Sequence, residues 1–541
     1  MPVTPSYPGI YIQELPSSTH TITAAPTSIA VFVGYTHPFL TLNPGKAVEI
    51  FSFTDYEREF GGFFTSNAFD SGTSKANFAS VANAVNQFFL NGGSDAYVIG
   101  LPATYYDLTT SPPTPHGKVS AVTATIGSIV FTALQPTDTV DLTVIVVPNA
   151  SNSAIADITI IYGSQIETYR GVTVTFNQAD NRNFIENRIN GTATNRISSL
   201  VKVTPLAPPT QGQPPNYGTA FTATPAAGQK LVYQTIPDPS WSVFNPADFT
   251  LGTPTAPAIF DQDSDLDKLP IFNLLVLPGI VDSGIISEAL AFCERKQAFL
   301  ILDPPITSQP ADGSITNYLS RVSPSTNGAL YFPYINSTDP ITGQPITLPP
   351  SGSVAGIYAR TDLNRGVWKA PAGLETTINN TTGVVDSGRM NDPRQGVLNL
   401  AGVDCLRTFP GIGTVVYGAR TLVSANPAYQ QWKYVPVRRM ALFIEQTLLR
   451  NLGWVVFEPN DEPLWAAIRL SIGNFMLSLF KQGALQGSTP SQAFQVKCDS
   501  STTTSDDQNN GIVNIIVAFA PLKPAEFVIV KIAQLAGQVQ S

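Results

Sequence analysis

Residues 431–488 of this chain read QWKYVPVRRMALFIEQTLLRNLGWVVFEPNDEPLWAAIRLSIGNFMLSLFKQGALQGS. Apolar residues recur at helical spacing on both sides of Gly453, which predicts one helix over about 437–451 and a second over 463–481, with Asn460 as its N-cap. The short apolar run 454–457 between them is rich in β-branched and aromatic residues, and we interpret it as a buried strand. The run 494–498 is expected to form the next strand. The stretch therefore predicts a mixed α/β domain.

The segment 526–532 differs from its surroundings because both alternating sets of a strand are apolar there. One set holds Phe527 and Ile529, and the other holds Val528, Val530 and Ile532. A strand so near a chain end is expected at a sheet edge, and an exposed edge that is apolar on both faces aggregates unless another chain pairs with it. The sequence therefore predicts that this chain end pairs with another polypeptide.

Composition indicates a well-packed protein of low charge. Of the 541 residues, 43% are hydrophobic and 13% are charged, and the net charge is −9. An acidic balance argues against nucleic acid or an anionic membrane as the main partner. No apolar run reaches the ~20 residues that span a bilayer, and the first residues lack a basic, apolar leader, so we expect assembly in the cytoplasm without direct membrane insertion. The scattered thiols Cys293, Cys405 and Cys498 fit a reducing compartment.

Motifs for catalysis and cofactor binding do not occur in the sequence. His20, His37 and His116 have no second ligand at metal spacing. Walker A, GxSxG, HExxH and paired CxxC motifs are missing, and the pair Gly411 and Gly413 fits a tight turn before a strand better than a dinucleotide fingerprint. We therefore expect no catalytic residue, no cofactor and no metal.

Two groups of charged residues admit more than one interpretation. One comprises Arg438, Arg439, Glu458, Asp461 and Glu462, and the other comprises Arg360, Arg365 and Lys369. The first could form an acid/base site, although such residues more often cap helices and form ion pairs. The second lacks the glycine cradle and carboxylates of a phosphate site, so we prefer a contact between subunits or a solvated face.

Composition shifts along the chain predict its domain organisation. Residues 1–26 form a proline-punctuated linking arm, and 27–100 with 257–370 form a discontinuous α/β domain. In that domain, strands 272–278 and 298–303 flank a helix, a βαβ unit that implies parallel strands. Residues 101–256 form an inserted outer β-rich domain. Residues 371–520 form a C-terminal domain, and 521–541 form a terminal strand.

The runs 434–439, 454–461, 464–465, 483–487, 496–499 and 520–527 occur in this order, after the runs 349–373 and 409–422. Together they resemble contractile tail sheath proteins, which are found in myophage tails, R-type pyocins and extracellular contractile injection systems. The segment 7–14 resembles the N-terminal arm of the same family. The resemblance implies that 371–520 form the inner domain of the sheath and that 1–26 and 521–541 are linking arms.

The resemblance implies an α/β multidomain fold with βαβ units in its core, a C-terminal mixed α/β domain and an inserted all-β domain. It implies a structural subunit rather than an enzyme. Such subunits polymerise as stacked hexameric rings around an inner tube protein and contract to drive the tube through a target envelope. Further partners would be baseplate and tail-terminator or cap proteins. The particle would be a virion tail, or a released or cell-anchored phage-tail-like particle.

The resemblance also implies strand exchange between subunits, by β-augmentation of a neighbour's C-terminal sheet. The exchanged residues are expected to be Gly9, Ile10, Tyr11 and Ile12 of the arm and Phe527, Val528, Ile529 and Val530 of the chain end. The polar face of the helix 463–481, with Arg469, Asn474 and Lys481, is expected to face the tube.

Two alternatives stay open at the level of sequence. One is a sheath-like tube protein that does not contract. The other is an enzyme, such as a hydrolase, built on the βαβ core, although no sequence motif supports an enzyme.

Overall fold

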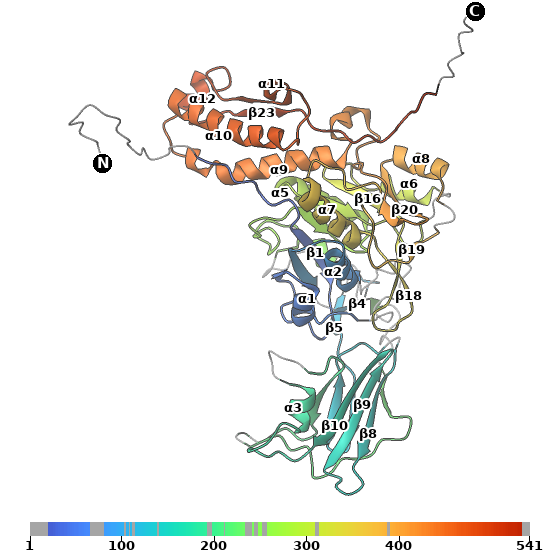
Figure 1. Cartoon of the computed structure of the whole chain (residues 1–541). Helices are drawn as coiled ribbons and strands as arrows, with labels where there is room; N and C mark the ends of the chain where they lie inside the picture. The colour runs from blue at the N-terminus through green and yellow to red at the C-terminus, as the bar shows by residue number, and fades with distance from the viewer. Residues whose placement is uncertain are drawn as a thin grey trace, which may run out of the picture. The chain divides into compact units, whose positions relative to one another are not determined.

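The computed structural model describes most of the chain (Figure 1). The described residues are 20–64, 80–101, 104–107, 109–110, 114–137, 140–191, 197–209, 211, 213–232, 241–242, 247–250, 257–308, 313–386 and 390–532. They form two compact units. The larger unit comprises Thr27–Asn364 and Ala370–Val435, and the smaller unit comprises Met1–Pro26, Arg365–Lys369 and Pro436–Ser541.

The larger unit is built on an eight-stranded sheet of order β2-β3-β1-β14-β15-β16-β20-β21 (Figure 1). The central strands run parallel, and β2 and β21 are antiparallel edges. Strands buried on both faces are near-continuous apolar runs, as in β1 and β14 to β16, where every residue is buried. The bounds are β1 (Ala30–Tyr35), β2 (Ala47–Ile50), β3 (Ala96–Leu101), β14 (Leu274–Val276), β15 (Phe299–Leu302), β16 (Gly328–Phe332), β20 (Val403–Phe409) and β21 (Gly413–Val416).

The predicted α/β class and the βαβ unit are both confirmed. Helix α5 (Ser283–Lys296) connects the parallel neighbours β14 and β15. Its N-cap Asp282 accepts hydrogen bonds from the N–H groups of Gly284 and Ile285, which stabilises the first turn of the helix. The other elements around the sheet are α1 (Phe53–Phe60), α2 (Ser80–Leu90), α6 (Ser314–Leu319), β17 (Ile335–Thr338), β18 (Pro345–Leu348), α7 (Ser351–Arg365), β19 (Gly383–Val384), α8 (Asp392–Leu400) and the 3-10 helix η2 (Pro427–Trp432).

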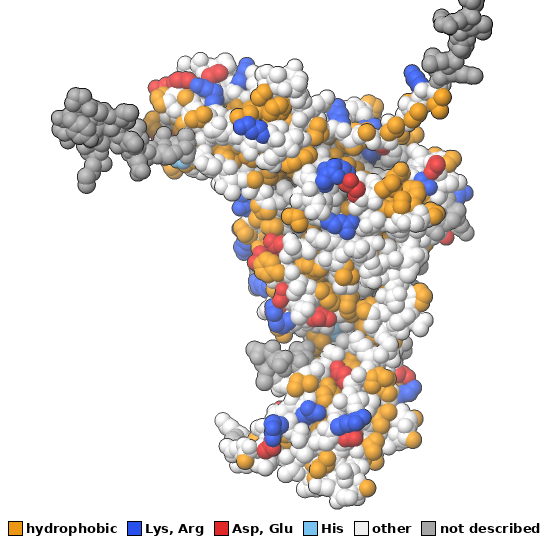
Figure 2. Space-filling model, in the orientation of Figure 1, with side chains coloured by type: hydrophobic (Ala, Val, Ile, Leu, Met, Phe, Trp, Pro, Cys, Tyr) orange, Lys and Arg blue, Asp and Glu red, His pale blue; other side chains and the backbone are white. Residues whose placement is uncertain are grey.

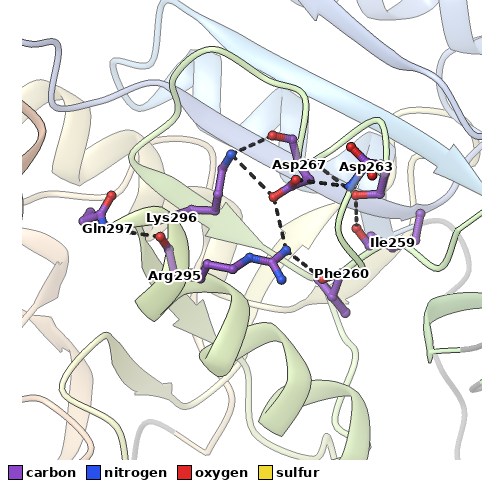
Figure 3. A network of polar contacts seen from close by, with 8 residues as sticks. Ile259, Phe260, Asp263, Asp267, Arg295, Lys296 and Gln297 are labelled. Carbon is purple, nitrogen blue, oxygen red and sulfur yellow. Dashed lines mark hydrogen bonds and ion pairs between the residues drawn. The ribbon is translucent and has the colours of Figure 1, made fainter. Parts of the chain in front are cut away.

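A cluster of ion pairs fastens the segment before β14 to the end of α5 (Figure 3). The carboxylate of Asp267 lies 3.1 Å from Arg295 and 3.5 Å from Lys296. Arg295 also donates to the carbonyl of Phe260. Burial raises the pKa of Asp267, but the hydrogen bond from the N–H of Asp263 and the two cations outweigh it and lower the pKa overall. The charged carboxylate therefore holds the 259–267 loop on the helix.

The inserted region consists mainly of β-strands around a core of its own, which agrees with the β-rich architecture predicted for it. Sheets β10-β9-β8-β12 and β11-β7-β6 enclose a separate apolar cluster. Gly127 and Gly163 adopt positive φ in the two-residue turns of the hairpins β6–β7 and β9–β10. The bounds are β4 (Thr104–Asp107), β5 (Thr114–Lys118), β6 (Thr123–Ile126), β7 (Ile129–Ala133), β8 (Leu142–Pro148), β9 (Ile155–Tyr162), β10 (Gln165–Thr173), α3 (Ile185–Ile189), β11 (Val201–Pro205), β12 (Gln229–Leu231), β13 (Trp241–Ser242) and α4 (Ala247–Thr250).

The smaller unit packs two long helices and a short sheet around one apolar core. Its elements are α9 (Val435–Asn451), the 3-10 helix η3 (Gly453–Val455), α10 (Glu462–Lys481), α11 (Pro490–Ala493), β22 (Phe494–Lys497), α12 (Ser505–Asn509) and β23 (Ile516–Phe519). The stripe of α10 that contains Ile468, Ile472 and Met476 is buried in this core. Both predicted helices are therefore confirmed.

Two local predictions in this unit were wrong. The run 454–457 is not a strand but the end of η3 followed by a turn, because Trp454 and Val455 pack against the helical core while Val456 and Phe457 turn outward. The N-cap of α10 is Asp461 rather than Asn460, since the Asp461 side chain accepts from the N–H of Glu462.

The predicted domain boundaries stay predictions. Strands β20 and β21 belong to the eight-stranded sheet although they fall within the predicted segment 371–520. Residues 370–435 likewise cluster with the larger unit.

Candidate functional site

The described end of the chain is an extended, exposed tail. Residues 522–532 form neither helix nor strand. Phe527, Val528, Ile529 and Val530 are 70%, 80%, 81% and 76% exposed. Figure 2 shows hydrophobic side chains along this tail just before the grey atoms begin. These predicted strand-exchange residues therefore have little packing within their own subunit.

The smaller unit also contains a sheet with open edges. β22 and β23 form a two-stranded antiparallel sheet, and neither has a second neighbour among the described strands. The N–H of Ala520 donates to the carbonyl of Ala493 at 2.8 Å, which continues the ladder beyond β23. Because backbone groups alternate in an antiparallel pair, those of Val517 and Phe519 then point to the open edge of β23. This edge can accept a further strand.

The outward face of the β22–β23 sheet differs between its two strands. The inward residues Phe494, Val496, Val517 and Phe519 pack against the core of the unit. On the outward face β22 presents Gln495 and Lys497, whereas β23 presents Ile516 and Ala518. One edge is thus polar and the other apolar, a difference that sequence analysis did not detect because it appears only once the register of the two strands is known.

The root of the N-terminal arm is fixed on α9. The backbone N–H and carbonyl of Thr23 both bond the Asn451 side chain at 2.9 Å, and the N–H of Ala25 donates to the Thr447 hydroxyl. The ring of His20 stacks on Trp454 with centroids 3.9 Å apart. The predicted exchange residues Gly9, Ile10, Tyr11 and Ile12 lie outside the described residues.

The three residues predicted to face a tube lie differently on α10. Asn474 and Lys481 are exposed. Arg469 is partly buried and bonds Glu462 at 2.5 Å and the carbonyl of Cys498. The hydrogen bond with Glu462 raises the pKa of Arg469. Arg469 therefore ties α10 to the residue that follows β22, and the tube-facing role stays a prediction.

The exposed face of α10 is largely uncharged. Ala466 and Asn474 are exposed on it, and Leu470 is 52% exposed. By length and composition α10 is the one described helix that could cross a membrane. Its buried stripe forms part of the core of the smaller unit.

Three of the charged residues considered as an acid/base site act in a helix cap or an ion pair. Asp461 caps α10, Glu462 binds Arg469, and Arg438 lies 3.2 Å from Glu445. In the second charged group, Arg360 donates a hydrogen bond to the carbonyl of Thr377, and burial lowers the pKa of Arg360.

Cysteines and histidines form no metal site in the described part of the chain. No group of three or more His, Cys, Asp or Glu residues that could hold a metal ion occurs among the described residues. All three cysteines are unpaired and buried, as expected for small core residues.

Two family models match successive parts of the chain. The phage tail sheath protein central domain matches residues 265–422, and the phage tail sheath C-terminal domain matches residues 428–534. Among curated relatives, a prophage protein of Pseudomonas aeruginosa described as a major tail sheath protein is 25% identical over 275 residues, which are 50% of this chain and 66% of that protein. The tail sheath protein of Burkholderia phage BcepMu is 28% identical over 224 residues, 40% of this chain and 46% of that protein. The matched stretch thus spans less than two thirds of each relative's length.

Solved structures resemble the whole fold. The sheath of the extracellular contractile injection system PVC, in its contracted state, has a TM-score of 0.56 at 21% identity and covers 98% of both chains. The contracted helical sheath of the anti-feeding prophage has a TM-score of 0.55 at 22% identity, over 98% of this chain and 100% of that chain. At such identities the likeness establishes the fold.

Proposed function

We propose that this chain, which belongs to the phage tail sheath family, is the structural subunit of a contractile sheath in a phage tail or phage-tail-like particle. The family is structural rather than enzymatic, so the work of contraction does not come from a catalytic site. It comes from the lattice: an extended, metastable assembly is released at the baseplate and gains contacts as it contracts.

The observation that carries the proposal is the pairing of an exposed apolar tail with an open-edged sheet in one unit. The tail residues 527–530 are apolar in both alternating sets and exposed, and β22–β23 has an open edge on each side among the described strands. A chain end of this kind is stable in water only when its backbone and side chains are covered. Exchange of tails between copies would cover the apolar tail and pair the open sheet edge in one step, and it would keep subunits linked while they move.

The proposed neighbours follow from the same arrangement. Copies of the chain form hexameric rings stacked around an inner tube protein, with the arm residues Gly9 to Ile12 and the tail residues Phe527 to Val530 joining rings. The exposed positions Asn474 and Lys481 of α10 support contact with the tube. A baseplate would nucleate the stack and a terminator protein would close it, consistent with the likeness to an anti-feeding prophage baseplate chain at a TM-score of 0.56.

Deletion of either chain end tests the proposal. Removing residues 1–16 leaves the contacts of His20, Thr23 and Ala25 intact, and removing residues 527–541 takes away only exposed or undescribed residues. We expect both truncated chains to remain folded, with unchanged circular dichroism and unfolding midpoint, and to form no long cylinders in negative-stain micrographs. Long cylinders from either truncated chain would contradict strand exchange by that end.

A non-contractile tube is the second candidate, favoured by nothing specific in the structure beyond the shared fold. Particles assembled with the partner tube and baseplate distinguish the two. A sheath that shortens and widens when the baseplate is triggered supports contraction, and a sheath of constant length supports the static tube.

A further inference from the structure

The turn between η3 and α10 carries a phenylalanine where local stereochemistry favours glycine. The N–H of Glu458 bonds the carbonyl of Val455 at 3.3 Å, so residues 455–458 form a β-turn. Val456 at its second position has φ −70° and ψ 129°, and Phe457 at its third has φ +70°. These angles describe a type II turn, whose third position normally holds glycine or asparagine. A bulky side chain there strains the backbone.

Nothing within the described part of the subunit compensates for this strain. Phe457 is 103% exposed and Val456 is 62% exposed. A residue that breaks a local rule without an internal gain is a candidate for function. Since both exposed side chains are apolar, the gain expected is burial against another molecule.

The surroundings of the turn indicate what that molecule carries. Glu458 and Asp461 flank the turn and are exposed. The turn is joined to α12 and its following loop, since Asn460 donates to the carbonyl of Ile512 and accepts from Gln508. Figure 2 shows acidic side chains gathered over the α12 end of this unit. A partner that fits should therefore be apolar with basic flanks.

The chain contains such a segment itself. Its tail holds the exposed apolar residues 527–530 and Ile532, with exposed lysines at 523 and 531, in a chain of net charge −9. When a tail that is apolar on both faces pairs with a sheet edge, one alternating set turns inward and the other is left facing outward. The apolar side chains of that outward set can be buried only by residues outside the receiving sheet.

We propose that Phe457, with Val456 beside it, is an anchor that packs on the C-terminal segment 527–532 of a second copy of this chain. The anchor lies on the unit that accepts the tail, next to the residues leading into β23. It completes burial of a tail whose inner face and backbone the sheet already covers. The inference rests on the proposed strand exchange and adds a side-chain contact to it.

Substitutions at 457 separate the side chain from the backbone. Phe457→Gly removes both the anchor and the strain, so the unassembled chain should gain about 2 °C in its unfolding midpoint while its critical concentration for cylinder formation rises about tenfold. Phe457→Tyr keeps the ring and the strain, so it should match the wild type in both measurements. Stability and assembly that move in opposite directions are not expected of a merely structural residue.

Photo-cross-linking identifies the occupant. Phe457→p-benzoylphenylalanine, irradiated in assembled particles that include the tube, should give a covalent dimer of the chain whose linked peptide contains residues 527–532. Cross-links mainly to the tube protein, or cylinder formation by Phe457→Gly at the wild-type concentration, would overturn the anchor while leaving strand exchange intact. Absence of cylinders from the wild-type chain with its partners would overturn both.

Discussion

The carboxyl of Asp303 is buried at the carboxyl end of β15 in the larger unit. It accepts hydrogen bonds from the N–H of Gly279 at 3.0 Å and from the N–H and hydroxyl of Ser351 at 2.9 and 2.6 Å. Burial outweighs these hydrogen bonds and raises the pKa of Asp303 to about 6. Because Ser351 begins α7, this one side chain links the loops after β14 and β15 to the start of α7.

The raised pKa predicts a pH dependence of stability with a definite sign. Since the folded pKa exceeds the unfolded value of about 3.9, the stabilising contribution is fully present below pH ~4 and is lost as the pH rises through about 6. The difference in unfolding free energy between wild type and Asp303→Asn should therefore shift by about 2–3 kcal/mol against the wild type between pH 4 and 7.

Urea unfolding of the unassembled chain across this pH range measures the shift. Asp248, held by the hydroxyls of Tyr35 and Tyr106, also has its pKa raised by burial to about 6, so the wild-type curve alone is not sufficient. Asp303→Asn retains Asp248, and only the difference between the two curves isolates Asp303. A constant difference over the range would contradict the prediction.

Position 457 shows where inference from the sequence fails at the scale of a residue. Two valines and two aromatic residues in succession favour a strand, and no glycine marks a turn. The turn forms because Trp454 and Val455 are drawn into the core of the smaller unit and Asp461 caps α10, so the chain must reverse direction between them. Tertiary packing overrides local preference here, and a single sequence cannot reveal that.

If chain ends are exchanged as proposed, the difference between the two edges of the β22–β23 sheet predicts which end pairs with each edge. The tail is apolar on both faces and matches the outward residues Ile516 and Ala518 of β23. In the arm sequence, the proposed pairing as a strand would place Ile10 and Ile12 in one alternating set and Tyr11 and Gln13 in the other. The second, more polar set would match the outward Gln495 and Lys497 of β22. Matched cross-strand pairs contribute about 0.2–1 kcal/mol each.

A matched pair of charge substitutions tests this assignment. Ala518→Glu should weaken protection of 526–532 from hydrogen exchange in assembled cylinders and leave 9–14 protected, because a carboxylate beside an apolar strand is poorly solvated. Gln495→Glu should leave the protection of 526–532 unchanged. The reverse pattern would mean that the tail pairs with β22 and the arm with β23. Loss of protection in both segments with either substitution would refute an edge-specific assignment.

Helix α10 shows what hydrophobic periodicity predicts and what it does not. Its length, its buried stripe and its start within a residue of the expected cap were predictable, because amphipathic spacing and capping chemistry are local. The place of Arg469 was not. The same spacing that suggested an exposed polar face allows a long side chain to reach the carbonyl of Cys498 near the end of β22.

For the whole molecule, strand exchange predicts how a defective subunit affects a polymer. A chain that lacks residues 527–541 retains the β22–β23 sheet and its arm root, so under the proposed exchange it would accept a neighbour's tail but could not donate one. Incorporated into a growing cylinder, it leaves a neighbour's sheet edge unfilled.

Mixtures of this truncated chain with wild type should therefore form shorter cylinders. Every truncated subunit removes one link between rings, so addition of the next ring competes poorly with dissociation. A mixture with about one truncated subunit in ten should therefore reduce the mean cylinder length severalfold. Cylinder lengths in negative-stain micrographs at fixed total concentration measure the effect, and a chain carrying Leu449→Ala, an exposed apolar change outside both ends, serves as the control. Lengths that fall only in proportion to the lost wild-type subunits would mean that truncated chains are excluded from the lattice. In that case a subunit must donate its tail in order to be admitted at all, and strand exchange would act at the entry step rather than only in holding the finished sheath together.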